Sequence, residues 1–172
     1  MNQQDARPLI VTLEFDAPTQ EWAQRMREAH FPPERNIVPA HVTLFHALPA
    51  DCRGSVCAYL DQPRPAPEVT IGAPYLLGRG VAYTVRSPAL AVLRDELVSL
   101  IGQERLTRQD AAPWRPHLTV QNKVTPEQAR SLLETLRQQS HPEQCHAAAA
   151  LRIWRYDGGP WTLLARIALT VR

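Results

Sequence analysis

The sequence predicts a mixed fold of strands and helices, built as two half-lobes of similar plan that share one cleft. Two observations predict it. Segments rich in β-branched and apolar residues alternate with segments whose apolar residues recur at helical spacing. The order strand, helix, strand, helix, strand also occurs twice, over about 8–77 and 81–170, with matching elements offset by roughly 70 to 76 residues. Each half is too short to bury much apolar surface alone, so we expect the two to pack together.

Helix start and stop signals organise the first half. Asp16, followed by Pro18 and Thr19, is typical of a helix N-terminus, and Pro32-Pro33 ends that helix. Prolines at alternate positions over 63–67 make a stiff connector. The expected elements are a strand over 8–15, a helix over about 16–30, a strand over 41–47, a short helix over about 52–61 and a strand over about 68–77.

The second half carries the clearer signals. Gly78-Arg79-Gly80 predicts a turn, and Ser87-Pro88 predicts an N-cap with proline in the first helical turn. Residues 125–128, Thr-Pro-Glu-Gln, resemble a capping box. The leucine stripe of the first helix comprises Leu90, Leu93, Leu97, Leu100 and Ile101. The expected elements are a strand over 81–86, a helix over about 87–101, a strand over 117–123, a helix from 125 to about 136, and strands over about 145–156 and 161–170.

Length and composition narrow the class of protein. The 172 residues suit one domain, and 44% apolar with 21% charged residues is typical of a soluble globular protein. A net charge of +2 argues against a surface that binds duplex DNA. No apolar stretch approaches the length of a membrane span, residues 1–5 lack the pattern of a signal peptide, and three cysteines are an odd number. We therefore expect a cytoplasmic chain with reduced thiols, no membrane partner and a monomeric state.

One short motif occurs in the middle strand of each half. Residues 41–44 read His-Val-Thr-Leu, and residues 117–120 read His-Leu-Thr-Val. Strand side chains alternate between the two faces, so each histidine shares a face with its threonine while the aliphatic pair faces the helices. Two such pairs on equivalent strands would meet across a shared cleft. The four candidate catalytic residues are His41, Thr43, His117 and Thr119.

This set of side chains suits phosphoester transfer without a metal. An imidazole titrates near ~6.5, so a neutral and a protonated ring can coexist near neutral pH. The neutral ring can take a proton from an attacking water or hydroxyl, and the protonated ring can give one to the leaving alkoxide. Threonine hydroxyls can donate hydrogen bonds to the non-bridging phosphate oxygens, where charge is held during the displacement. The two histidine–threonine pairs would form a nearly symmetric clamp around the phosphate, so the sequence does not tell which histidine is the acid.

The two motifs carry a family resemblance. The chain resembles the 2H phosphoesterases, a family named for two His-x-Thr/Ser-x motifs, and in particular its bacterial 2′-5′ RNA ligase-like branch. Pro39-Ala40, Arg115-Pro116 and residues 154–161 also resemble that branch, and the likeness covers nearly the whole chain. It implies a bilobal, pseudo-twofold α+β fold with two β-sheet lobes, each flanked by helices, and the active-site cleft between them. It also implies metal-independent activity on 2′,3′-cyclic phosphates or 2′-5′ linkages of RNA ends, short oligonucleotides or cyclic nucleotides.

Residues around the second motif are weaker candidates for substrate binding. Arg115 would share the face of His117 if Pro116 keeps the chain extended, and it could then grip a phosphate. A solvated arginine at a strand start explains it equally well. Gln121 also lies on that face, where a hydrogen bond in the cleft is one option, and Lys123 at the strand end is expected in solvent.

Two aromatic residues are candidates for base stacking. Phe45 continues the face of His41 and Thr43 and could stack on a base, although a core position explains it equally well. Tyr156 shares a strand face with Trp154, and both invite a stacking role for which packing is the alternative.

Metal binding and ligand binding without turnover are alternative interpretations of these residues. His41, His46, Cys52 and Cys57 lie close in sequence, but their spacing does not match the short ligand pairs of zinc sites, so we expect no metal and no cofactor. A cleft that holds a nucleotide or RNA end without turnover is the alternative function, and a pair of core strands whose polar groups merely satisfy each other is the purely structural explanation. The histidines expected to have ordinary surface or core roles are His30, His46, His141 and His146.

Overall fold

Seven strands form one continuous sheet in the computed structural model, which describes residues 6–139 and 144–169. Its strand order is β1-β2-β5-β4-β3-β6-β7, and a further pairing of β1 with β6 closes six strands into an antiparallel barrel. The seventh strand extends the sheet from β6. The strands are β1 (Leu9–Phe15), β2 (Val42–Leu48), β3 (Glu68–Leu76), β4 (Val81–Arg86), β5 (His117–Gln121), β6 (Gln144–Tyr156) and β7 (Trp161–Ala168).

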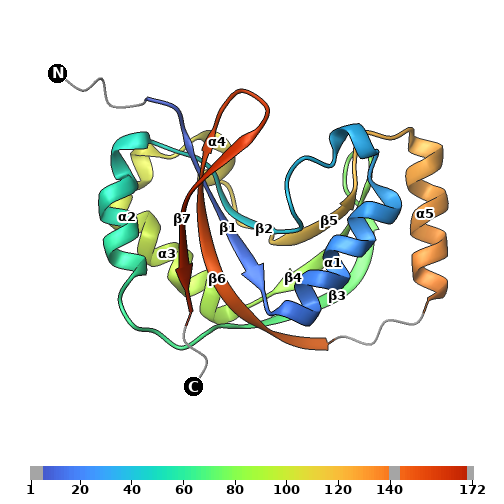
Figure 1. The fold of residues 1–172 in the computed structure, drawn as a ribbon, viewed down its shortest axis with the longest axis horizontal. Coiled ribbons are helices and arrows are strands. Elements are labelled where there is room, and N and C mark those ends of the chain that lie inside the picture. The colour runs from blue at the N-terminus through green and yellow to red at the C-terminus, as the bar shows by residue number, and fades with distance from the viewer. Residues whose placement is uncertain (1–5, 140–143, 170–172) are drawn as a thin grey trace.

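Helices occupy both ends of the molecule (Figure 1). At one end α2 packs against α3 and β7, and at the other α1 lies on β5 while α5 lies on β3 and β4. The α-helices are α1 (Ala17–His30), α2 (Arg53–Leu60), α3 (Pro88–Ile101), α4 (Arg108–Ala111) and α5 (Pro126–Gln138). Short 3-10 helices are η1 (Pro33–Arg35), η2 (Ala50–Cys52) and η3 (Gln103–Arg105). No helix in the described part of the chain has the length and apolar character needed to span a membrane.

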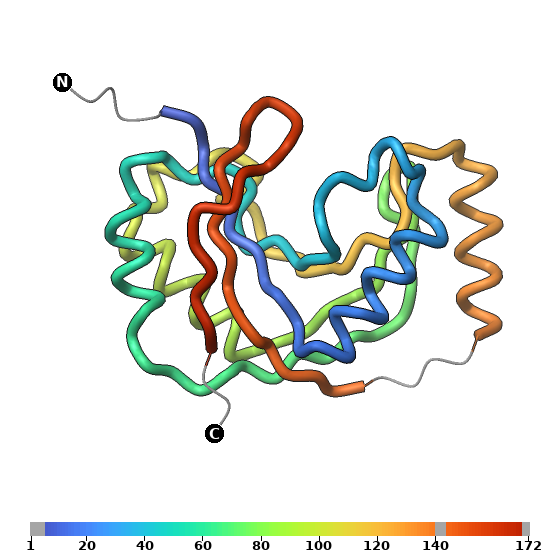
Figure 2. The backbone as a smooth tube through the Cα atoms, in the orientation of Figure 1, coloured from blue at the N-terminus to red at the C-terminus, as the bar shows by residue number. Residues whose placement is uncertain are grey.

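The α+β class is confirmed, but the expectation of two separate sheets, one for each half of the sequence, is wrong. Strand β3 of the first half forms a hairpin with β4 of the second, and β6 of the second half pairs along β1 of the first. Figure 2 shows the red C-terminal hairpin beside the blue N-terminal strand. Closing the barrel pairs strand edges that two open sheets would leave exposed, which is a physical reason why strands of the two halves pair with each other.

Helix starts agree with the capping signals. The Asp16 carboxylate accepts the Thr19 N–H at 3.1 Å, and the Ser87 hydroxyl accepts the Leu90 N–H at 3.2 Å. Thr125 and Gln128 form the expected capping box. The stripe of α3 is buried except for Leu100, which is 44% exposed because it lies at the margin of the apolar face.

One strand boundary and one short helix differ from the sequence predictions. Strand β5 ends at Gln121 and does not reach Lys123, because Lys123 has a left-handed φ of 61° and begins a turn. Gly80 lies against this turn, and a β-carbon there would come within 1.9 Å of the Gln121 carbonyl oxygen. The short helix α4 was not predicted, because four residues are too few to show a helical repeat.

Candidate active site

The two His-x-Thr motifs lie side by side where β2 meets β5. The pairing of these strands is a single antiparallel pair, Val42 with Leu118. On either side of it the register places His41 opposite Thr119 and Thr43 opposite His117. Directly opposed residues of antiparallel strands share a face of the sheet. The four polar residues therefore gather on one face, which we call the motif face.

Burial supports this division of the two faces. Val42, Leu44, Leu118 and Val120 are each 0% exposed, as expected for side chains that face the core. The four polar residues of the motifs are half-buried. Each motif thus presents its polar pair on a surface that a ligand can reach, while its aliphatic pair anchors the strand.

Both motif histidines are held in the same way. The Nδ1 atom of His41 lies 2.6 Å from the Pro39 carbonyl oxygen, and Nδ1 of His117 lies 2.8 Å from that of Arg115. A carbonyl oxygen only accepts, so in each ring Nδ1 carries a proton and donates it to the chain two residues earlier. Nε2 of each ring has no hydrogen-bond partner among the described residues, and in the neutral ring it carries the lone pair.

The charge state of His41 follows from its surroundings. Burial of the ring lowers the pKa of His41 to about 4, although the Nδ1 bond to Pro39 acts in the opposite direction. The nearby charges of Arg27 and His117 lower it further. His41 is therefore a neutral imidazole at pH 7, with a free lone pair on Nε2, which is the form that accepts a proton.

Side chains hold the backbone of both motif threonines. The Trp114 indole N–H donates to the Thr43 carbonyl oxygen at 3.0 Å, and Nη1 of Arg27 donates to the Thr119 carbonyl oxygen at 3.0 Å. Arg27 is buried on α1, with Nε bonded to Asn36 at 3.0 Å. Burial lowers the pKa of its guanidinium to about 10, so it still carries its charge at neutral pH. These donors replace sheet hydrogen bonds where β2 and β5 diverge.

Buried ionic side chains form hydrogen bonds with further backbone groups of β2 that do not pair with β5. The Asp110 carboxylate accepts the N–H groups of His46 and Ala47 at 2.8 and 2.9 Å, and also bonds Nδ1 of His46 at 3.1 Å. Burial opposes ionisation of Asp110, but these hydrogen bonds lower its pKa overall. Arg94 donates to the Leu44 carbonyl oxygen at 2.9 Å and to the Asp110 carbonyl oxygen at 2.6 Å. This cluster fixes the strand that carries the first motif.

Phe45 is not a stacking residue, and that prediction is wrong. Thr12 of β1 pairs with Thr43, whereas Val11 pairs with Phe45, so Leu44 is an extra residue in a β-bulge. The bulge interrupts the alternation and turns Phe45 into the core, where it is 0% exposed. The Arg94 guanidinium lies over its ring, 4.7 Å from the centroid.

The other sequence-derived candidates lie at the rim of the motif face or outside it. Arg115 is exposed, and its charge acts on Tyr75, so a phosphate role for it remains a prediction. Tyr156 is 40% exposed and stays a candidate for base contact. Gln121 is buried, and its Oε1 has no partner among the described residues, while Lys123 is exposed as expected.

Trp161 lies against His41, although sequence reasoning did not select it. Its ring centroid lies 5.1 Å from that of His41 and 6.0 Å from that of Trp154. The β6–β7 hairpin that carries it projects beyond the barrel (Figure 2). Asp157 fixes the hairpin by accepting hydrogen bonds from Arg7, Arg155 and Thr162.

Trp154 itself has the packing role. It is 6% exposed, and its indole N–H donates to the Thr12 hydroxyl at 2.8 Å. The run 154–161 was recognisable as a motif, but only the fold shows which of its aromatic rings reaches a catalytic candidate.

The remaining histidines have separate surroundings. His46 bonds Asp110, His146 bonds the Thr19 hydroxyl at 2.8 Å, and burial lowers the pKa of His30. His141 lies outside the described residues. Within residues 6–139 and 144–169, no three histidine, cysteine or acidic side chains cluster as a metal site would require.

Comparisons with known proteins match this chain to a sequence family and to solved structures. The family model of the 2′-5′ RNA ligase superfamily matches residues 15–160. The structure resembles Escherichia coli LigT complexed with 3′-AMP, with a TM-score of 0.63 at 20% identity over 96% of this chain and 99% of that chain. It also resembles the protein TT0787 of Thermus thermophilus, with a TM-score of 0.62 at 14% identity over the same shares. No curated protein matches the sequence. At these identities the structural likeness shows the fold.

Proposed function

This chain belongs to the 2′-5′ RNA ligase superfamily, and we propose that it is a metal-independent phosphodiesterase. Its substrates are 2′,3′-cyclic phosphates or 2′-5′ linkages of nucleotides, short oligonucleotides or RNA ends. Depending on the substrate, it would hydrolyse such a bond or form it in the reverse reaction. The LigT structures contain 3′-AMP and ATP, which supports a nucleotide or RNA end as the ligand of this fold.

The observation that carries the proposal is the register of β2 against β5. On either side of the single Val42–Leu118 pair, an imidazole lies opposite a threonine. The Nδ1 atom of each ring is bonded to the carbonyl oxygen of the residue two positions earlier. A phosphorus atom between the two Nε2 atoms would have one ring on the side of the attacking oxygen and the other on the side of the leaving oxygen. That is the arrangement that in-line displacement requires.

We assign the base from the charge state of His41, and the acid role then falls to His117. His41, neutral at pH 7, takes the proton of an attacking water on Nε2. The water oxygen bonds to phosphorus, and the bond from phosphorus to the 2′ or 3′ oxygen breaks. His117, in its protonated form, gives a proton to that leaving oxygen, so the ribose regains a hydroxyl and keeps a phosphomonoester. Thr43 and Thr119 donate hydrogen bonds to the non-bridging oxygens, where negative charge is held.

A first experiment tests the activity as a whole. Cyclic mononucleotides and short RNAs with 2′,3′-cyclic ends are incubated with the protein in the presence of a chelator, and products are followed by chromatography. We expect phosphomonoester products that form at the same rate with and without chelator. Loss of activity to the chelator would contradict the metal-independent mechanism.

A binding module that does not turn its ligand over is the alternative function. Calorimetry that shows tight binding of a cyclic nucleotide, together with no product after long incubation, would favour it. The two fixed imidazoles favour the enzyme, because binding alone needs hydrogen-bond donors and not two groups poised to exchange protons.

The titration of His41 should differ from that of an ordinary histidine. Because the general base acts in its neutral form, titration of His41 should not change kcat/KM at pH values above its pKa of about 4. Below that pKa, kcat/KM should fall about tenfold per pH unit. The ring proton resonances of His41, identified by their loss in His41→Ala, should report the same midpoint by NMR. Circular dichroism at each pH verifies that the protein remains folded. A His41 midpoint near ~6.5, the ordinary value for histidine, would contradict the assignment of the base.

Trp161 should contribute to binding of the nucleobase and little to the chemical step. We expect Trp161→Ala to raise KM for 2′,3′-cyclic AMP by about 5- to 140-fold, since stacking of one base on an aromatic ring is worth roughly 1–3 kcal/mol. Its kcat should change much less. Ribose 2′,3′-cyclic phosphate, which has no base, is the control substrate, and Trp161→Phe the control variant. An equal loss of kcat with both substrates would instead mean that the indole positions His41.

A further inference from the structure

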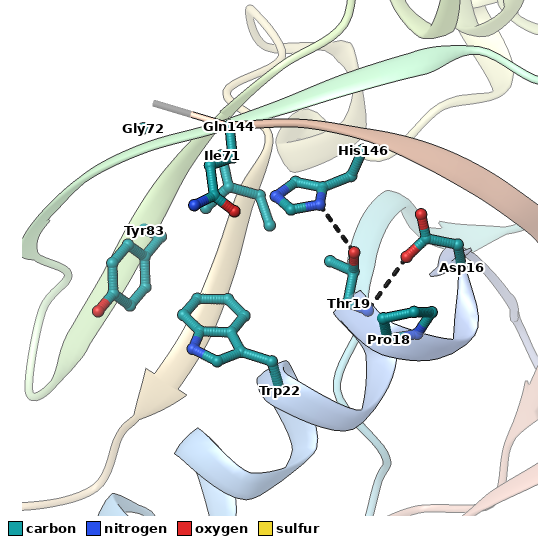
Figure 3. Close-up of a pocket in the computed structure, with 9 residues that line it drawn as sticks. All are labelled: Asp16, Pro18, Thr19, Trp22, Ile71, Gly72, Tyr83, Gln144 and His146. Carbon is teal, nitrogen blue, oxygen red and sulfur yellow. Dashed lines mark hydrogen bonds between the residues drawn. The ribbon is translucent and has the colours of Figure 1, made fainter. Parts of the chain in front are cut away.

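A cavity of about 470 Å³ lies away from the motifs (Figure 3). It is bounded by the start of α1 on one side and by β3, β4 and β6 on the other. Volumes of this order suit small organic ligands. The residues that line it are Asp16, Pro18, Thr19, Trp22, Ile71, Gly72, Tyr83, Gln144 and His146.

This cavity lies on the face of the sheet opposite to the motif face. Tyr83 pairs with Leu118, the residue between His117 and Thr119, so Tyr83 shares the core face with Leu118. Ile71 pairs with Gln144, and the two lie on one face of the neighbouring strands. A ligand in this cavity would therefore be separated from the motif residues by the thickness of the sheet.

One side of the cavity is aromatic and apolar. The ring centroids of Trp22 and Tyr83 lie 5.4 Å apart in an edge-to-face arrangement, and Ile71 lies beside them. Trp22 is half-buried on α1, whereas Tyr83 is 1% exposed in β4. A flat apolar ring can pack against this wall with little rearrangement.

Other residues of the lining offer hydrogen-bonding groups. Figure 3 shows the His146 ring and the Gln144 amide directed toward the space between Ile71 and Trp22. Nδ1 of His146 is engaged by the Thr19 hydroxyl at 2.8 Å, which leaves the far ring nitrogen for a ligand. The Gln144 amide can donate and accept. A planar heteroaromatic ring, which has both donors and acceptors at its edge, matches these groups.

Asp16 supplies a carboxylate to the cavity. Burial opposes ionisation of Asp16, but hydrogen bonds from Thr19 and from the Ala147 N–H, together with the charge of His146, lower its pKa overall. Among the described residues that line the cavity, none is a lysine or an arginine. A phosphate group would meet the Asp16 carboxylate there, with no lysine or arginine among the described lining residues to offset the repulsion.

We propose that this cavity is a second ligand site, which binds a nucleoside by its base and disfavours a nucleotide. The proposal does not depend on the activity of the motif face. The two sites should rank the same compounds in opposite order, because the motif face presents phosphate-binding groups and this cavity presents a carboxylate.

Calorimetry of the full chain tests the proposal with adenosine and AMP as probes. The titrations use the wild type and the His41→Ala/His117→Ala double variant. We expect adenosine to bind both proteins with the same Kd within about twofold, and AMP to bind the double variant about tenfold more weakly than adenosine. No adenosine binding, binding lost in the double variant, or tighter binding of AMP to that variant would each overturn the proposal.

Two further variants locate the site. Trp22→Ala should weaken adenosine binding about tenfold, whereas Met26→Ala, one turn later on α1 and outside the cavity lining, should leave it unchanged. Equal effects of the two would overturn the assignment. Asp16→Asn keeps a side chain suited to a helix N-cap and should bring the AMP and adenosine affinities to within about threefold. An unchanged gap would show that Asp16 does not set the preference. Turnover of 2′,3′-cyclic AMP by Asp16→Asn, measured in parallel, reports separately on the motif face.

Discussion

Replacement of either motif histidine by alanine should reduce turnover of a 2′,3′-cyclic nucleotide by roughly 10²–10⁴-fold, the usual contribution of one acid–base group. In His41→Ala no group takes the proton of the attacking water, and in His117→Ala no group protonates the leaving oxygen. The two losses arise in one displacement step, so the double variant should be scarcely slower than the slower single variant. Initial rates of product formation at saturating substrate measure both effects.

His30→Ala is the matched control for these variants. His30 is a half-buried histidine at the end of α1, and the structure records no hydrogen bond of its ring within the described residues. Its replacement should leave turnover within about twofold of the wild type, which is the usual range for a surface substitution of little energetic consequence. Thermal unfolding of all variants verifies that they are folded. Undiminished turnover in either motif variant would contradict the assignment of that histidine.

The sequence predicted the motif face because its signals are local. In a strand that alternates regularly, a histidine and a threonine two residues apart share a face, so His41 joins Thr43 and His117 joins Thr119. The same holds for the caps at Asp16 and in other helices, whose donors and acceptors lie within three residues of each other. Such features need no knowledge of which strands pair.

The strand pairing was beyond this reasoning. A repeated order of elements predicts two similar units, but it does not tell whether each unit forms its own sheet. In the structure β3 pairs with β4 and β6, and β1 pairs with β6, so strands from both halves share one closed barrel. The pairings of β6 with β1 and with β3 join residues far apart in the chain, and their stability depends on the assembled barrel and not on any local pattern.

Long-range contacts also decide which residues support the site. Arg27 and Trp114 resemble ordinary helix and loop residues in the sequence, yet each donates to the carbonyl oxygen of a motif threonine. Trp161 reaches His41 only because the hairpin carries it there. Conversely, Phe45 departs from the expected alternation because one extra residue in β2 turns it into the core. Single bulges of this kind have no reliable sequence signal.

Loss of the motif hydroxyls should have the next largest effect on turnover. Thr43→Val and Thr119→Val keep the shape of the side chain and remove a hydrogen-bond donor, and each should lower kcat by roughly 10²–10³-fold, as is typical when one donor to a developing negative charge is removed. Neither hydroxyl has a hydrogen-bond partner among the described residues, so the change should leave folding nearly unaffected. Because the donors act on the transition state, KM should change much less than kcat.

Thr84→Val provides the matched control, since Thr84 pairs with His117 from β4 and its exposed hydroxyl bonds the Ala73 carbonyl oxygen at 3.3 Å. It is a strand threonine next to the second motif but outside it, and its replacement should leave kcat within about twofold of the wild type. Equal losses in all three variants would mean that any hydroxyl near His117 affects the rate, and the phosphate clamp would be wrong. Losses confined to Thr43→Val and Thr119→Val would support both threonines as phosphate ligands, because the register of β2 against β5 places one of them opposite each motif histidine.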